Sequence, residues 1–184
     1  MPSIRTATAA LLALALTASP APPPAAAAST AEIDRDVSTA LAKMYDSNPD
    51  SRHLGSQARA VLVFPSIVKA GFLFGAQYGE GGLVQQGRVT AYYNTVAASY
   101  GLQAGVQTFG YALFFMSDSA VRHLNNSGGF ELGTGPSIAI FDVGAARSLS
   151  TTTAHSDIYA IFFDQKGLMA GAGLQGAKIT RLDK

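Results

Sequence analysis

The residue types that most often carry out catalysis are few in this sequence, and their spacing does not assemble a site. His53, His123 and His155 are the three histidines, and none has a partner at the spacing of a zinc site. The chain has no cysteine, which removes thiolate metal ligands and thiol nucleophiles. Ser156 and Asp157 follow His155, but neighbours along a strand point to opposite faces, so this run does not form a catalytic triad. The sequence therefore predicts that the protein is not an enzyme and holds no metal and no cofactor. A hydrolase built on Asp157 and His155 is the least favoured alternative.

Basic residues gather in two stretches that suit an anionic surface. Residues 52–69 contain three basic residues and no acidic one, interleaved with apolar side chains, and the C-terminal residues add further basic ones. Each basic residue held near an anionic membrane contributes roughly 1 kcal/mol to binding. Two phenylalanines in a neighbouring strand are candidates for contact with an acyl chain. The candidate lipid-binding residues are Arg52, Arg59, Lys69, Phe72, Phe74, Lys178 and Arg181. The alternative interpretation of the basic residues is ordinary solvated charge.

The overall charge balance excludes one large class of partner. Arg5 is the one charged residue among the first 28, and the rest of the chain has 12 basic and 12 acidic residues. A nucleic-acid-binding protein would show a high positive charge, so no nucleic-acid partner is expected. Hydrophobic residues make up 48% and charged residues 14%, a composition that predicts a folded core in a chain of one-domain length.

The first thirty residues have the pattern of an export signal. Arg5 precedes an apolar run at residues 9–16, and prolines and then Ala26–Ala28 follow, with small residues suited to cleavage. The apolar run is shorter than the roughly 20 residues that a membrane-spanning helix needs, and no transmembrane segment is expected in the mature chain. The pattern predicts a cleaved signal peptide at residues 1–28 and an exported protein, periplasmic or secreted, with a peripheral position at the outer membrane as one possible location.

The mature chain begins with helical patterns and continues with β patterns. Ser29 and Glu32 form a capping box before apolar residues at helical spacing, which predicts a helix that ends near residue 46, and a second helix is expected over residues 51–60. Pro65 is expected to end the strand 61–64, and residues 78–82 and 164–167 are expected to be connections. The other expected strands are 67–76, 83–85, 88–93, 100–116, 130–132, 137–142, 157–163 and 168–180, with a short helix at 117–124.

Glycines lie inside many of these β segments and need a structural reason. Each one weakens a strand by roughly 0.5–1 kcal/mol relative to alanine, so several together indicate curvature, bulges or close approach of another backbone. A ligand lying on the strands is the alternative cause. The prediction is an α+β fold in which N-terminal helices pack on a curved, mostly antiparallel, glycine-rich β-sheet or small barrel. The glycines concerned are Gly71, Gly75, Gly101, Gly105, Gly110, Gly171 and Gly173.

Several of these glycine-rich runs resemble, in order, the SYLF family of lipid-binding domains. The resemblance covers about residues 32–182 and implies one SYLF-like domain over residues 29–184, with phospholipid as its partner and no catalytic activity. The chain lacks tryptophan where eukaryotic members carry it and has an acidic first helix, so phosphoinositide and actin binding are not implied. The runs are residues 61–75, 99–107, 135–137, 157–159, 166–171 and 176–179.

Together these patterns predict a non-catalytic protein of the cell envelope that binds phospholipid or an anionic membrane surface. The alternative is a structural or protein–protein interaction module of the periplasm, whose protein partner the sequence does not identify.

Overall fold

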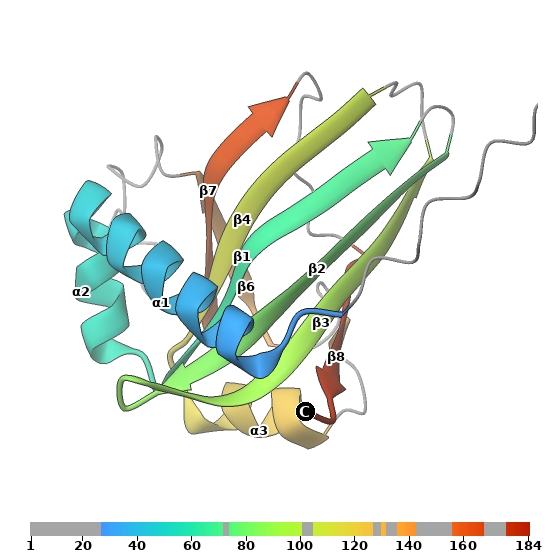
Figure 1. Ribbon diagram of the computed structural model, residues 1–184. Coiled ribbons are helices and arrows are strands. Elements are labelled where there is room, and N and C mark those ends of the chain that lie inside the picture. The colour runs from blue at the N-terminus through green and yellow to red at the C-terminus, as the bar shows by residue number, and fades with distance from the viewer. Residues whose placement is uncertain are drawn as a thin grey trace, which may run out of the picture.

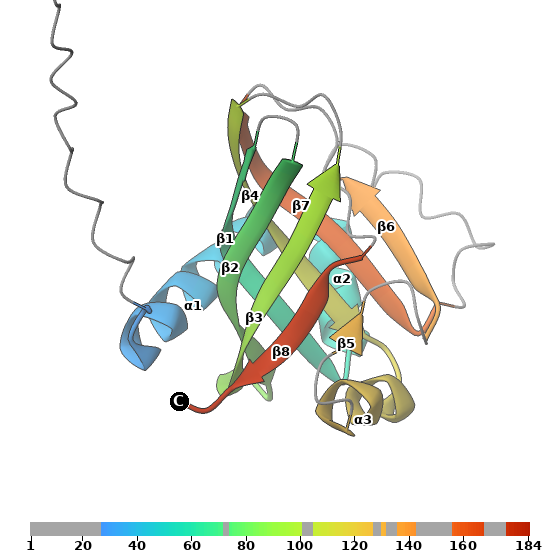
Figure 2. The same ribbon diagram turned by 90° about the vertical axis from the view of Figure 1, so that its right-hand side faces the viewer.

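The computed structural model describes residues 27–71, 74–100, 105–126, 130–131, 136–142, 156–167 and 176–184. Most of the predicted signal peptide lies outside these residues, as do Phe72, His155, Gly101, Gly171 and Gly173. The described residues form three helices and one sheet of eight strands (Figures 1 and 2).

The two N-terminal helices are fixed by local capping. Helix α1 (Thr30–Ser47) begins after Ser29, whose hydroxyl accepts the backbone N–H of Glu32 while the Glu32 carboxylate accepts the N–H of Ser29, which confirms the predicted capping box. Helix α2 (Pro49–Gln57) begins two residues earlier than predicted. The reason is that the Asn48 side chain caps it, and Pro49 is suited to a first helical turn, where no N–H is needed.

The strands form one curled sheet in which every neighbouring pair is antiparallel except β6 and β7. Their order across the sheet is β5-β8-β3-β2-β1-β4-β7-β6. The curl is visible in Figure 2, where β2, β3 and β8 follow one another across the middle of the picture and β6 lies at the right. The predicted α+β fold, with N-terminal helices on a curved and mostly antiparallel sheet, is confirmed. The strands are β1 (Ala60–Gly71), β2 (Phe74–Gln85), β3 (Arg88–Tyr100), β4 (Gly105–Phe115), β5 (Phe130–Glu131), β6 (Ile138–Asp142), β7 (Ile158–Gly167) and β8 (Lys178–Leu182).

Pro65 does not end its strand, contrary to the sequence-based expectation. Strand β1 runs through it, and the register with both neighbouring strands shifts by one residue at this point. A proline cannot donate to the strand ladder, and a bulge accommodates it inside a central strand. The chain is therefore bent near the middle of β1.

Of three connections predicted between strands, the structure contains one. Residues 78–82 lie within β2 and residues 164–167 within β7, although both were predicted to be connections. In β2 the glycines are required by packing: a Cβ atom at Gly81 would come within 2.2 Å of the Val63 carbonyl oxygen. The predicted hairpin at Gln86 and Gly87 is present, and both residues have the positive φ angles that such a turn requires.

The sheet has a buried core on each face. The inner, concave face holds large side chains of six strands and is closed at one end by α3 (Asp118–Asn126), whose Ala120 and Leu124 pack into it. On the outer, convex face, α1 and α2 cover apolar residues of β1, β4 and β7, and the absence of a side chain at Gly82 allows Val37 of α1 to approach the sheet. Figure 1 shows α1 and α2 lying across one end of the strands, while the other ends of β1, β2 and β4 extend beyond them.

Candidate membrane-contact surface

The residues that the sequence singled out for lipid binding are distributed over separate regions. Arg52 and Arg59 lie near the α2 end of the molecule, and both have acidic partners. The Arg52 guanidinium is 2.8 Å from an Asp46 carboxylate oxygen and stacks over the Tyr45 ring, and Arg59 lies 3.7 Å from Asp118. These two arginines line a shared groove, but neighbouring carboxylates offset their charge.

The other predicted residues lie on opposite faces of the sheet. Lys69 is buried on the concave face, and Arg181 lies on that same face beside Tyr93, because it pairs directly with Tyr93 across β3 and β8. Phe74 and Lys178 lie on the convex face, where both are exposed. Phe74 therefore does not line an enclosed acyl site within the described part of the chain.

The exposed half of the convex face carries an apolar surface, which we name the bare face. Successive outward positions on four neighbouring strands supply it, and the exposed fractions of its large side chains run from 46% for Val96 to 73% for Phe74. Alanines at intervening outward positions are exposed as well. Large exposed apolar patches usually mark sites of contact with a membrane or a partner. The bare face consists of Val68, Ala70, Phe74, Ala76, Tyr78, Val96, Ala98 and Val106.

Lysines lie on both sides of this surface in a single row across the sheet. Val68 pairs with Tyr78 on β2, Tyr78 with Val96 on β3, and Val96 with Lys178 on β8. In the other direction, Val68 pairs with Thr108 on β4, and Thr108 with Lys166 on β7. Directly paired residues of adjacent strands point to the same side of a sheet. Two exposed lysines therefore flank the apolar centre of the bare face.

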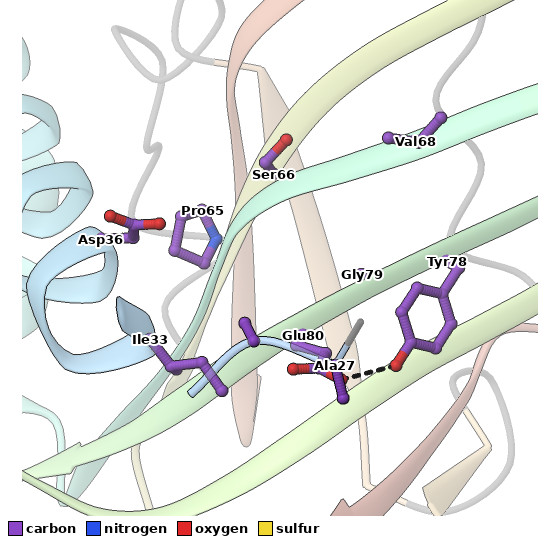
Figure 3. A pocket seen from close by; sticks show the side chains of 10 residues that line it. Ala27, Ile33, Asp36, Pro65, Ser66, Val68, Tyr78, Gly79 and Glu80 are labelled. Carbon is purple, nitrogen blue, oxygen red and sulfur yellow. Dashed lines mark hydrogen bonds between the residues drawn. The ribbon is translucent and has the colours of Figure 1, made fainter. Parts of the chain in front are cut away.

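An open groove of about 360 Å³ borders the bare face where α1 begins (Figure 3). Its walls are the start of α1, the bulge of β1 and the middle of β2, with Ile33, Pro65, Val68 and Tyr78 among its lining. The groove is mainly apolar, and Glu80 supplies a polar end, where the Tyr78 hydroxyl donates a 2.7 Å hydrogen bond to its carboxylate.

Glu80 also holds the C-terminal residue in place. The Lys184 ammonium is 2.7 Å from the Glu80 carboxylate and donates to the carbonyl oxygen of Ala28, so it connects the start of α1 to β2. Burial disfavours the charged form of Glu80, but hydrogen bonds from Lys184 and Tyr78 outweigh burial and lower its pKa. Burial and the bond to Glu80 raise the pKa of Tyr78 to about 12. Tyr78 therefore stays neutral over the physiological range.

Comparison with known proteins identifies the family. Residues 96–184, which run from β3 of the bare face to the C-terminus, match the family Ysc84, described as Las17-binding protein actin regulator. The chain belongs to this SYLF (Ysc84) family. It is also 26% identical over 125 residues to Protein YSC84 of Saccharomyces cerevisiae. The match includes 64% of this chain but spans 27% of the yeast protein, about a quarter of its length.

In this SYLF domain, sequence reasoning missed most of the bare face. Val68, Tyr78, Val96 and Val106 were assigned no role, and Lys166 was not among the candidate basic residues. The available signal was apolar residues at alternate positions in 74–78 and 96–98, but residues 78–82 were interpreted as a connection, which hid the alternation.

The described residues of the SYLF domain contain neither a membrane-spanning helix nor a metal-binding cluster. None of its described helices is long and apolar enough to span a membrane. Within the same ranges, no three histidine, cysteine, aspartate or glutamate side chains group in a way that could hold a metal ion.

Proposed function

We propose that this SYLF domain binds the surface of a membrane that contains anionic phospholipid, and that it does so with the bare face. The observation that carries the proposal is the row of paired residues in which Lys166 and Lys178 flank Val68, Tyr78 and Val96. Apolar side chains would enter the boundary between headgroups and acyl chains, and the lysines would contact phosphate groups beside them.

The chemistry of the bare face favours a lipid interface over bulk water. Tyr78 combines an apolar ring with a polar hydroxyl, the combination that is enriched where membranes meet water. Lys166 and Lys178 would add roughly 1 kcal/mol each near an anionic surface. Together with partial burial of five large apolar side chains, this gives reversible peripheral binding.

The proposed function also places the protein at a membrane of the cell envelope and assigns it no catalytic activity. The signal-like pattern of residues 1–28 supports an exported protein that reaches an envelope membrane from the periplasmic or outer side. The proposed role is non-catalytic, with phospholipid as the partner and no cofactor.

Vesicle co-sedimentation tests the proposal directly. The protein should pellet with phosphatidylglycerol vesicles and much less with phosphatidylcholine vesicles, and high salt should weaken the binding because the lysine contribution is screened. The double variant Val68→Asp/Val106→Asp should reduce binding at least about tenfold, because it places two carboxylates among the apolar contacts. The matched control is Gln57→Asp/Ser119→Asp, which adds the same charge on α2 and α3, outside the bare face. Equal binding by both double variants would contradict the proposal.

A protein partner is the second candidate, favoured by the description of the matched family as a Las17-binding protein actin regulator. In that case the bare face would bind a partner in place of lipid. Binding would then be absent with every vesicle composition, and the Val68→Asp/Val106→Asp variant would lose the partner instead.

A further inference from the structure

A row of buried polar side chains crosses the concave face of the sheet, on the side opposite the bare face. Lys69 on β1 pairs with Gln77 on β2 and with Gln107 on β4, so the three side chains point the same way. Ile67, two residues before Lys69, lies in the concave core, which places the row on that face. The exposed fractions of Lys69, Gln77 and Gln107 are 6%, 5% and 3%.

Part of the hydrogen-bonding capacity of this row is unused. The Nε2 atom of Gln77 and the Oε1 atom of Gln107 are buried and have no hydrogen-bond partner. Among the described residues, no side-chain hydrogen bond or ion pair involves Lys69. Buried polar groups are nearly always paired in proteins, so two unpaired buried atoms beside a lysine in one row need an explanation.

A neighbouring pair on the same face shows what satisfied polar groups look like here. The Tyr111 hydroxyl donates a 2.9 Å hydrogen bond to the Thr95 hydroxyl, and both residues are fully buried. The sheet therefore accommodates buried polar residues by pairing them, and the Lys69 row departs from this pattern.

The row lies near the end of the curled sheet that is opposite α3. Helix α3 closes the opposite end, and apolar layers fill the space up to Ile67 and Phe109. Beyond the row, the next concave positions on the same three strands are Gly75, Gly71 and Gly105, which pair with one another. No side chain of β1, β2 or β4 therefore lies between the row and the end of these strands, which Figure 1 shows extending away from the helices.

We propose that Lys69, Gln77 and Gln107 form a binding site for one oxyanion, a phosphate group, at the end of the concave face that lies away from α3. The Lys69 ammonium supplies the charge, and the Gln77 amide donates an N–H to a phosphate oxygen. The two orientations of a glutamine amide occupy the same volume, so Gln107 can also present its N–H group. The phosphate can belong to a lipid headgroup or be free in solution. This site does not depend on the proposed function, because it lies on the other face and uses none of the residues of the bare face.

Calorimetric titration with inorganic phosphate and with dodecyl phosphate tests the site and separates its two sources. Binding of both ligands with similar affinity indicates free phosphate, and binding of dodecyl phosphate alone indicates a lipid headgroup. Lys69→Met should weaken binding about tenfold to a hundredfold, because it removes a charge-assisted hydrogen bond and keeps the apolar stem. The matched control, Lys43→Met on α1, alters an exposed lysine outside both proposed sites and should bind within about twofold of the unaltered protein.

Lys69→Met should also raise the urea midpoint of the ligand-free protein, since it removes the charge of a mostly buried lysine whose side chain makes no hydrogen bond or ion pair within the described part of the chain. If this variant does not fold, Gln107→Leu tests the same row with the same expected loss. The proposal is overturned if neither phosphate compound binds, or if the variants of the row bind as tightly as the Lys43→Met control.

Discussion

The convex face of the sheet carries apolar side chains in both of its halves, but the two halves have different surroundings. In the covered half, Val61 and Val63 of β1 and Phe114 of β4 are buried under α1 and α2. In the bare half, beyond the bulge at Pro65, Val68 of β1 and Val106 of β4 occupy the equivalent outward positions and are exposed. The same strands therefore supply core on one side of the bulge and surface on the other.

The difference shows that alternation of apolar residues determines which face they lie on, but not whether that face is covered. Coverage depends on the position and length of α1, which ends at Ser47 and crosses only part of the strands (Figure 1). Apolar side chains that no helix covers are costly to keep in water unless they serve an interaction. The uncovered half is therefore the part of the convex face where we expect contact with a membrane or a partner.

The largest expected difference between the halves is in stability. Val63 is fully buried and Val68 is 48% exposed, and both point to the convex face of β1. Val63→Asp should lower the free energy of unfolding by about 4 kcal/mol or more, because it buries an unpaired carboxylate. Val68→Asp should change it by about 1 kcal/mol or less, since that side chain reaches water. Urea denaturation followed by circular dichroism measures both, and equal costs would show that the bare half is also covered.

The Glu80–Lys184 pair lies at the border between the halves and should have an intermediate effect. Its side chains are 9% and 17% exposed, so Glu80→Gln leaves a largely buried ammonium with a weaker partner and should cost about 1–3 kcal/mol. The control is Asp46→Asn, which removes an exposed ion pair with Arg52 and should cost about 0–1 kcal/mol.

The same pair predicts a pH dependence with a definite sign. The pKa of Glu80 is lowered in the folded protein, so its contribution to stability is complete above the ordinary value near 4.5 and is lost as the pH falls through the folded pKa. The difference in urea midpoint between Glu80→Gln and the unaltered protein should therefore be full at pH 7 and should shrink as the pH is lowered below 4.5. A constant gap between them over this range would contradict the assignment.

Local chemistry was predictable from the sequence, and long-range register was not. The capping box of Ser29 and Glu32 and the turn at Gln86 and Gly87 were found because each depends on residues a few positions apart. The curved sheet was predicted from glycines within β segments. Pro65 was misjudged because its bulge depends on β2 and β4, which hold the strand on both sides.

The candidate site was predicted only in part for the same reason. Phe74 and Lys178 were both among the candidate lipid-binding residues, but their common face follows from the pairing of β2, β3 and β8. Lys69 was grouped with Arg52 and Arg59 by charge and sequence proximity. The fold separates them, because a one-residue change in register moves a side chain to the opposite face of a strand.

The smallest expected effects concern the charges beside the two halves. Lys166→Gln and Lys178→Gln should each weaken binding to phosphatidylglycerol vesicles about fivefold, which corresponds to roughly 1 kcal/mol per lysine. Arg52→Gln and Arg59→Gln remove the same charge near the covered half, where Asp46 and Asp118 already offset it, and should change binding less than about twofold. Co-sedimentation at low and high salt distinguishes the lysine variants from the arginine variants. Only the lysine variants should show vesicle binding that depends less on salt concentration than that of the unaltered protein. Greater losses from the arginine variants would move the membrane contact to the α2 end of the molecule.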